Sequence, residues 1–186
     1  MKRSLDYSVD FTAGPRPRAT LTYTYNHTAL GGDWRTSDYH TYTRVYTPAG
    51  STYVENSRRK TGGVGAETSD TLHKTVFGYK VDVLMRQTLE TGISYDLPDT
   101  IKEDAYRLLI QKQSGIDTLP ATIHLKTSKG EFTASYDIKK DVVYQMGLLA
   151  EQMGRKEEAI AFFKEIYSVD IKYRDIAQRI EASYQK

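Results

Sequence analysis

Hydrophobic and polar residues alternate with a period of two through most of the first 137 residues. This period is typical of strands with one buried face, because successive side chains of a strand point to opposite sides. About eight such stretches are separated by turn signals such as Ala13-Gly14-Pro15. Short strands with one apolar face must pair two sheets or close a barrel, and we favour an antiparallel, immunoglobulin-like sandwich. The predicted strands cover residues 5–11, 19–25, 41–46, 77–83, 89–97, 106–110, 121–125 and 132–138.

The apolar period changes to 3.6 residues near residue 138, which predicts helices. Gly154 stands where a helix C-terminal glycine belongs, so it separates two helices. A third helix is predicted from Asp175 to Tyr184. The first helix has an apolar stripe of Val142, Val143, Met146, Leu149 and Ala150, and the second has one of Ala159, Ile160, Phe162, Phe163 and Ile166.

Composition changes at the same place as the period. All 21 threonines, all five prolines and 11 of the 13 glycines precede residue 138. Thr and Tyr suit pleated strands, whereas the Ala, Glu, Lys and Gln of the later part favour helices. The sequence therefore predicts an α+β protein with a β-sandwich at 1–138 and a helical tail at 139–186.

Charge and hydropathy exclude several functional classes. A net charge of +2 in 186 residues is too balanced to indicate nucleic acid as a partner. No apolar run is long enough for a membrane span, so we expect no membrane insertion by this chain. The basic start Met1-Lys2-Arg3 is not followed by the apolar stretch of a signal peptide, so a cytoplasmic location stays open.

The helical tail resembles one tetratricopeptide repeat, a helix–turn–helix unit of about 34 residues. The resemblance rests on Met146-Gly147, Gly154, Glu158-Ala159-Ile160, Phe163 and Val169-Asp170, while Ala150 and Ile171 depart from it. Such repeats usually bind proteins, and about three are needed for independent stability. We therefore expect the tail to pack against the sandwich, a second copy of the chain or a partner.

Four segments of the β part form a further pattern: 34–39, 41–46 with Pro48 and Gly50, 74–78, and 106–113 with Gly115. On these segments the β part resembles the C-terminal region of the family called domain of unknown function 4012. The resemblance spans most of residues 5–137 and implies a location at the cell surface or outside the cell, since members of that family look like membrane-anchored envelope proteins. No activity is implied.

No residue pattern predicts catalysis, a cofactor or a metal site. Lys60 precedes the glycines Gly62, Gly63 and Gly65, whereas a phosphate-binding loop places the lysine after them and before a helix. Residues 57–73 are instead predicted to form a long polar loop, and loops of this length without their own secondary structure are usually mobile. The four histidines are scattered at no metal-ligand spacing. We expect the protein not to be an enzyme.

Three functional hypotheses stay open. The first is a cell-envelope scaffold whose helical tail docks a protein or a second copy of the chain, with Tyr144, Phe162, Tyr167 and Tyr173 as candidate partner-binding residues. The second is a carbohydrate-binding sandwich, with Tyr23, Tyr25, Tyr42 and Tyr46 as candidate glycan-binding residues. The third is an engineered fusion or an excised fragment with no function of its own, because the change of character near residue 138 is abrupt.

Overall fold

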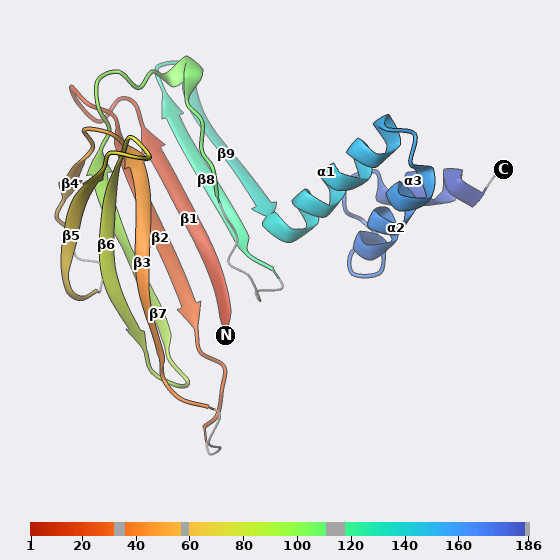
Figure 1. Ribbon diagram of the computed structural model, residues 1–186, viewed down its shortest axis with the longest axis horizontal. Coiled ribbons are helices and arrows are strands. Elements are labelled where there is room, and N and C mark those ends of the chain that lie inside the picture. Colours follow the sequence, from red (N-terminus) through yellow and green to blue (C-terminus); the bar gives the residue numbers. More distant parts are fainter. Residues whose placement is uncertain (32–35, 57–59, 111–117, 185–186) are drawn as a thin grey trace. The chain divides into compact units, whose positions relative to one another are not determined.

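A computed structural model describes residues 1–31, 36–56, 60–110 and 118–184. It divides into two compact units. The first, the β unit, contains Met1–Gln111 and Pro120–Ser135, and the second, the helical unit, contains Lys112–Leu119 and Tyr136–Lys186. The change from strands to helices lies where the period of the sequence changes (Figure 1).

The β unit is built from two sheets (Figure 1). One has six strands in the order β4-β7-β2-β1-β8-β9, and the other has three in the order β3-β6-β5. Neighbours in the first sheet pair antiparallel at β1–β2, β2–β7 and β4–β7, whereas β1 and β8 run parallel. The strands are β1 (Lys2–Asp10), β2 (Arg18–Asn26), β3 (Tyr39–Pro48), β4 (Thr52–Val54), β5 (Thr61–Ser69), β6 (Lys74–Val83), β7 (Thr88–Asp96), β8 (Pro120–Thr127) and β9 (Gly130–Asp137).

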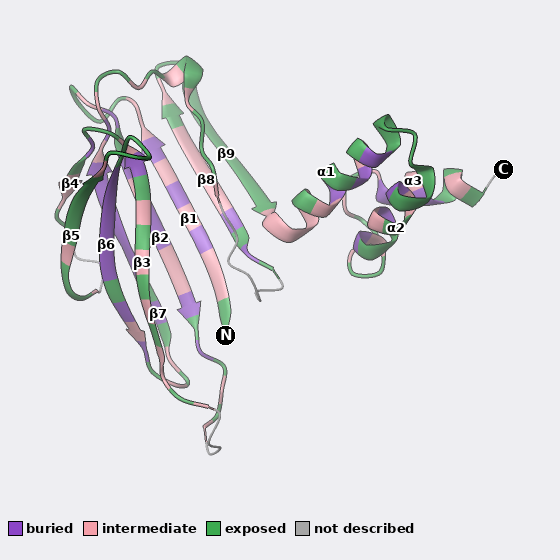
Figure 2. Ribbon diagram, in the orientation of Figure 1, coloured by how far each residue is buried: buried purple, intermediate pink, exposed green. Residues whose placement is uncertain are grey.

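The core of the β unit lies between the two sheets. Phe77 of β6 packs against Tyr95 of β7 with ring centroids 5.8 Å apart, and Tyr25 of β2 lies 5.9 Å from Tyr39 of β3. Most of the inward positions predicted for β1, β2, β6 and β7 are buried, and in β6 and β7 several residues between them are buried as well (Figure 2). Burial decreases from β1 through β8 to the edge strand β9, which is exposed along nearly its whole length.

Two predictions about the β unit are wrong. Residues 61–69 belong to a strand, β5, rather than to a loop, while residues 57–59 lie outside the described part of the chain. The backbone of this glycine-rich edge strand pairs with β6, but most of its side chains are exposed, so no apolar alternation marks it. Conversely, residues 106–110 form no strand, and Leu109 is almost fully exposed. The short β4 was missed because three residues carry no measurable period.

The helical unit contains α1 (Ile138–Gln152), α2 (Lys156–Tyr167) and α3 (Ile176–Tyr184). As predicted, a glycine follows the end of α1: Gly154 has a φ of +76°, which is readily accessible only to glycine. Gly147 lets α2 approach closely, because a Cβ there would lie 2.3 Å from Phe163. The buried core is Tyr144, Ala150, Ala159, Phe163, Ile166, Ile176 and Ile180.

The protein is therefore α+β, with three helices and two sheets of six and three strands. This coarse class is as the sequence predicts. No helix in the described part of the chain has both the length and the hydropathy needed to cross a membrane.

Candidate functional site

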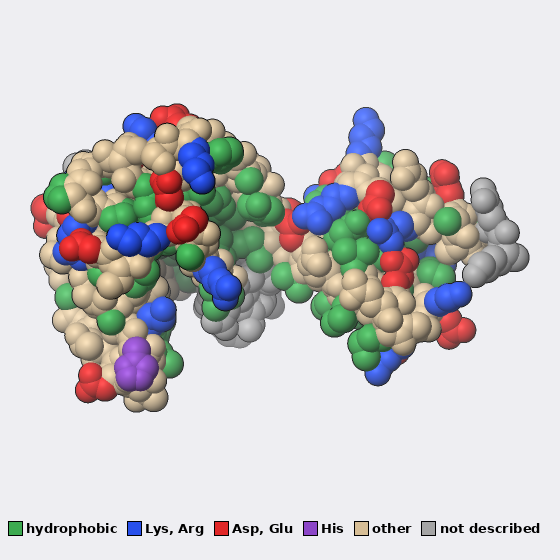
Figure 3. All heavy atoms as spheres, turned by 90° about the horizontal axis from the view of Figure 1, so that it is seen from above, with side chains coloured by type: hydrophobic (Ala, Val, Ile, Leu, Met, Phe, Trp, Pro, Cys, Tyr) green, Lys and Arg blue, Asp and Glu red, His purple; other side chains and the backbone are tan. Residues whose placement is uncertain are grey.

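Helix α1 exposes four large apolar side chains: Val142, Met146, Leu149 and Met153. We call this set the α1 stripe. The spacing of four, three and four residues places all four on one side of the helix. They are between 44% and 56% exposed. Hydrophobic side chains gather on this unit between charged ones (Figure 3).

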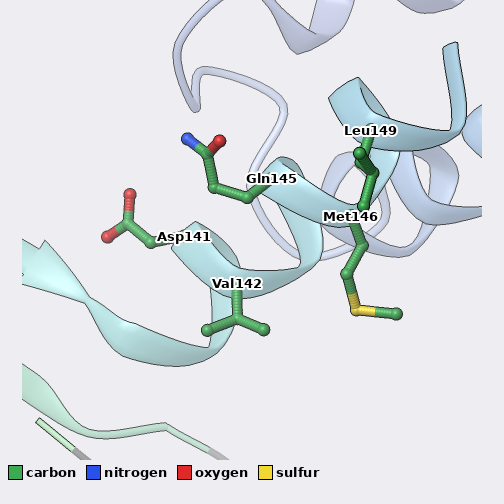
Figure 4. Close-up of a pocket in the computed structure, with 5 residues that line it drawn as sticks. All are labelled: Asp141, Val142, Gln145, Met146 and Leu149. Carbon is green, nitrogen blue, oxygen red and sulfur yellow. The ribbon is translucent and has the colours of Figure 1, made fainter. Parts of the chain in front are cut away.

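A shallow groove follows the first part of the stripe and is lined by Asp141, Val142, Gln145, Met146 and Leu149 (Figure 4). Val142 and Met146 project to the same side of α1, whereas Asp141 and Gln145 project elsewhere. The groove therefore has an apolar floor with a carboxylate and an amide at its margin.

A neighbouring side of α1, about 100° around the helix axis from the stripe, forms the core of the helical unit. Gly147 and Ala150 are buried there, and Val143 packs against the same core. The sequence period predicts a single stripe of Val142, Val143, Met146, Leu149 and Ala150, but the structure divides these residues between two faces. Helical spacing alone could have separated the exposed set (142, 146 and 149) from the buried set (143, 147 and 150). Each member of one set is one position from a member of the other, which is a rotation of about 100° around the helix.

The residues predicted to bind a partner are mostly structural. Tyr144 is buried, and its hydroxyl donates to Asp175 Oδ1 at 2.6 Å. Phe162, Tyr167 and Tyr173 are half-buried against the core. The position of Tyr144 does not support its predicted role in partner binding, because its ring lies 5.9 Å from that of Phe163 inside the unit.

Polar contacts hold the connection before α3 against α1. Asp141 accepts hydrogen bonds from Tyr173 and from the Arg174 guanidinium. Burial raises the pKa of Tyr173, and the bond to the Asp141 carboxylate raises it further. The hydrogen bond from Tyr144 lowers the pKa of Asp175. These contacts fix the wall of the helical unit beside the groove.

The tyrosines predicted to bind glycans lie on different faces. Tyr25 is buried between the sheets, which excludes it from a surface site. Tyr23 is mostly covered, and its burial raises its pKa to about 12. By contrast, Tyr42 and Tyr46 lie on the outward face of β3 and are exposed. Strand alternation explains the division between inward and outward positions, but sequence alone does not show which face is covered.

A line of a hydroxyl, an imidazole and a carboxylate crosses the outward face of the six-stranded sheet. His124 Nδ1 lies 3.0 Å from Thr133 Oγ1, and His124 Nε2 lies 3.0 Å from Asp6 Oδ2. The His124 and Asp6 side chains are 43% and 49% exposed. Water surrounds such groups, whereas catalytic electrostatics depend on a water-excluded site. We interpret the line as a contact that joins β1, β8 and β9.

Within the described residues, no cluster of three or more His, Asp or Glu side chains is arranged to hold a metal ion. Trp34 and Arg35, which begin one of the segments that resemble the 4012 family, lie outside the described part of the chain.

None of the protein-family models matches the chain, and neither a curated protein nor a solved structure matches it. The resemblances to the 4012 family and to the tetratricopeptide repeat therefore stay predictions.

Proposed function

We propose that this protein is a non-enzymatic interaction module whose helical unit docks a partner protein through the α1 stripe. The observation that carries the proposal is that α1 is apolar on two sides. One side covers Phe163 and the rest of the core, while the other presents Val142, Met146 and Leu149 to solvent. A helix that is apolar on only one side would need no further cover.

The groove suits an amphipathic helix. Such a ligand would place apolar residues at helical spacing against the stripe, as in other helix-in-groove contacts. Met146 and Met153 are flexible and polarizable, so they can adapt to different apolar partners. Gln145 at the margin offers its amide oxygen as an acceptor to a basic or hydroxyl-bearing residue of the ligand.

The finer interpretation of the fold supports the same function. The close approach of Gly147 and Phe163 is what a tetratricopeptide-type hairpin needs, and repeats of that type present helix faces to proteins. We infer an immunoglobulin-like sandwich for the β unit, which would serve as the scaffold. A cell-envelope location rests on the resemblance of that unit to the 4012 family.

A double substitution in the stripe tests the proposal. Met146→Glu with Leu149→Glu puts two charges on the docking face without touching the core, so the helical unit should still fold. Quantitative crosslinking in the native host, compared with the unsubstituted protein, should show loss of a defined set of crosslinked proteins.

The matched control is Val169→Glu with Ile171→Glu, which changes two exposed apolar residues between α2 and α3. This control should retain the crosslinked set. An unchanged set in the stripe variant, or equal loss in both variants, would show that the stripe is not the docking surface. Sedimentation of both variants would show whether the partner is a second copy of the chain.

A further inference from the structure

The outward face of the three-stranded sheet carries a second surface, which the docking function does not use. Tyr42 and Tyr46 of β3 point to this face and are 52% and 53% exposed. They are four positions apart, which corresponds to about 13 Å along a strand. Val76 lies directly opposite Tyr46 on the same face and is almost fully buried.

The Tyr42 ring lies flat on the sheet. In the neighbouring strand, a Cβ on Gly78 would lie 2.1 Å from the Tyr42 hydroxyl and 2.7 Å and 2.8 Å from two ring carbons. A Cβ on Gly65 of β5 would lie 3.9 Å from the same hydroxyl. The ring therefore extends from β3 across β6 toward β5, over positions that have no side chain. One face of the aromatic ring therefore lies against the sheet, while the Arg44 guanidinium lies over the ring and the side chain as a whole is 52% exposed.

Two cations flank this ring. The Arg44 guanidinium carbon lies 5.4 Å from the ring centroid, and Lys80 is directly opposite Tyr42 in the strand register. Neither forms an ion pair within the described part of the chain, whereas Arg18 is paired with Asp96 on the other sheet. The acid nearest to Lys80 along β6, Asp82, is already bound to His40 at 2.6 Å.

From this arrangement we infer that the Tyr42 surface binds a chain of pyranose sugars that carry carboxylates. The electron-rich face of a tyrosine attracts the C–H groups of a flat sugar ring, and burial of that ring face adds apolar contact. Arg44 and Lys80 then attract the carboxylate, since neither cation is held in a salt bridge within the described residues. Tyr46 extends the surface along β3, so a chain of rings suits it better than one sugar. The inference does not depend on the docking function of α1.

The test compares two probes with the same ring shape. Cello-oligosaccharides are neutral, and β-1,4-glucuronate chains of the same length carry a carboxylate on each ring. Calorimetric titration of the full chain at low salt should show binding of the glucuronate chain and weaker binding of the neutral one. Added salt should reduce the difference, because exposed charges are screened.

Substitutions separate stacking from charge. Tyr42→Ala should weaken the binding of both probes roughly tenfold. Arg44→Gln and Lys80→Gln should each weaken only glucuronate binding, by up to about fivefold. Gly78→Ala should resemble Tyr42→Ala, because the new methyl group displaces the ring. Gly63→Ala is the matched control, since nothing lies within 4 Å of its Cβ.

The inference is overturned if neither probe binds, or if the Tyr42→Ala and Gly78→Ala variants bind as the Gly63→Ala variant does. A preference for glucuronate that survives the double Arg44→Gln, Lys80→Gln substitution would also overturn it. Circular dichroism of each variant separates these outcomes from loss of the fold.

Discussion

The β unit and the helical unit use exposed aromatic and apolar residues differently. In the β unit, the exposed Tyr42 lies flat across Gly78, and the sheet beneath it is held by backbone pairing between strands distant in sequence. In the helical unit, the α1 stripe stands on a helix whose other face is needed for a small core. A rigid, flat surface suits flat ligands, whereas a helix with two apolar faces suits another helix. The two proposed binding surfaces therefore differ in chemistry: one is a flat aromatic ring on a sheet, and the other is an apolar helix face.

Equivalent core substitutions should produce the largest effects and separate the two units. Phe77 in β6 and Phe163 in α2 are each 1% exposed. Truncation of either to Ala should lower the free energy of unfolding of its own unit by about 3–5 kcal/mol. For Phe163→Ala this should unfold the helical unit, because a core of this size gives little stability. For Phe77→Ala the β unit should melt at a lower temperature and stay folded at room temperature.

Hydrogen exchange of each variant, followed by mass spectrometry, checks this expectation. The Phe163→Ala variant should lose protection in residues 138–184 only, and Phe77→Ala should lose it in the strands only. Leu149→Ala is the control, because Leu149 is exposed and its truncation leaves no cavity. Loss of protection across both units in either variant would show that the two units unfold as one.

Alkaline pH should destabilise the β unit more steeply than the helical unit. Burial raises the pKa of Tyr7, Tyr79 and Tyr95, which are all within the β unit. Below pH 10 both folded and unfolded states keep these protons, so stability does not change. Above pH 10 the unfolded state loses them first, and each tyrosine lowers the free energy of unfolding by about 1.4 kcal/mol per pH unit.

In the helical unit, burial also raises the pKa of Tyr144 and Tyr173. Two tyrosines therefore lower the stability of this unit above pH 10, against at least three in the β unit. Far-ultraviolet circular dichroism at rising pH should show strand signal lost more steeply than helix signal. Tyrosinate absorbance gives a second readout. If all 15 tyrosines ionised near pH 10 in a protein that stayed folded, burial would not control their ionisation.

A smaller effect is expected from Gly147→Ala in α1. The added methyl group would collide with the Phe163 ring, which costs about 1–3 kcal/mol. Alanine favours a helix over glycine by about 1 kcal/mol, which offsets part of that cost. Chemical denaturation should therefore show a net loss of about 1 kcal/mol. Adding Phe163→Leu should cost less in this background than in the unsubstituted protein, and equal costs would exclude the collision.

The sequence predicts most of the strands but misses β4 and β5. Strands β1, β2, β6 and β7 have one face in the core, so their apolar alternation follows from burial. Most side chains of β5 are exposed, and its pairing uses backbone groups that leave no trace in the side-chain pattern. Residues 106–110 have the alternation without the strand, since their sequence satisfies the period while no neighbouring strand pairs with them.

For the candidate site residues too, the sequence pattern selects the residues but does not show which of them are exposed. The sequence selects Tyr42 and Tyr46 together with Tyr25, because all three are tyrosines in alternating strands. Only the arrangement of the sheets decides that Tyr25 is inside and the other two outside. In α1 the period selects apolar residues, but the partner helix decides which of them stay exposed. The flat position of Tyr42 depends on Gly78, which is 36 positions away in the sequence and is brought close by the β3–β6 pairing.

The smallest expected effect concerns Tyr106, which lies in the segment that the sequence wrongly predicts as a strand. Its hydroxyl lies 2.5 Å from that of Tyr7, and its ring meets Phe11 edge-on at 5.8 Å. These contacts attach the segment to β1 and its end without any ladder of backbone hydrogen bonds. Tyr106→Phe keeps the ring contact and removes one hydrogen bond, so the free energy of unfolding should fall by about 0.5–1.5 kcal/mol. Tyr7 keeps its other partner, the Tyr95 hydroxyl at 2.9 Å, which limits the loss. Chemical denaturation measures the difference, with Tyr39→Phe as the control, because the Tyr39 ring packs on Tyr25 while its hydroxyl has no hydrogen bond among the described residues. Equal stabilities of the two variants would mean that the hydroxyl of Tyr106 does not hold the segment, and that its ring contact with Phe11 is sufficient.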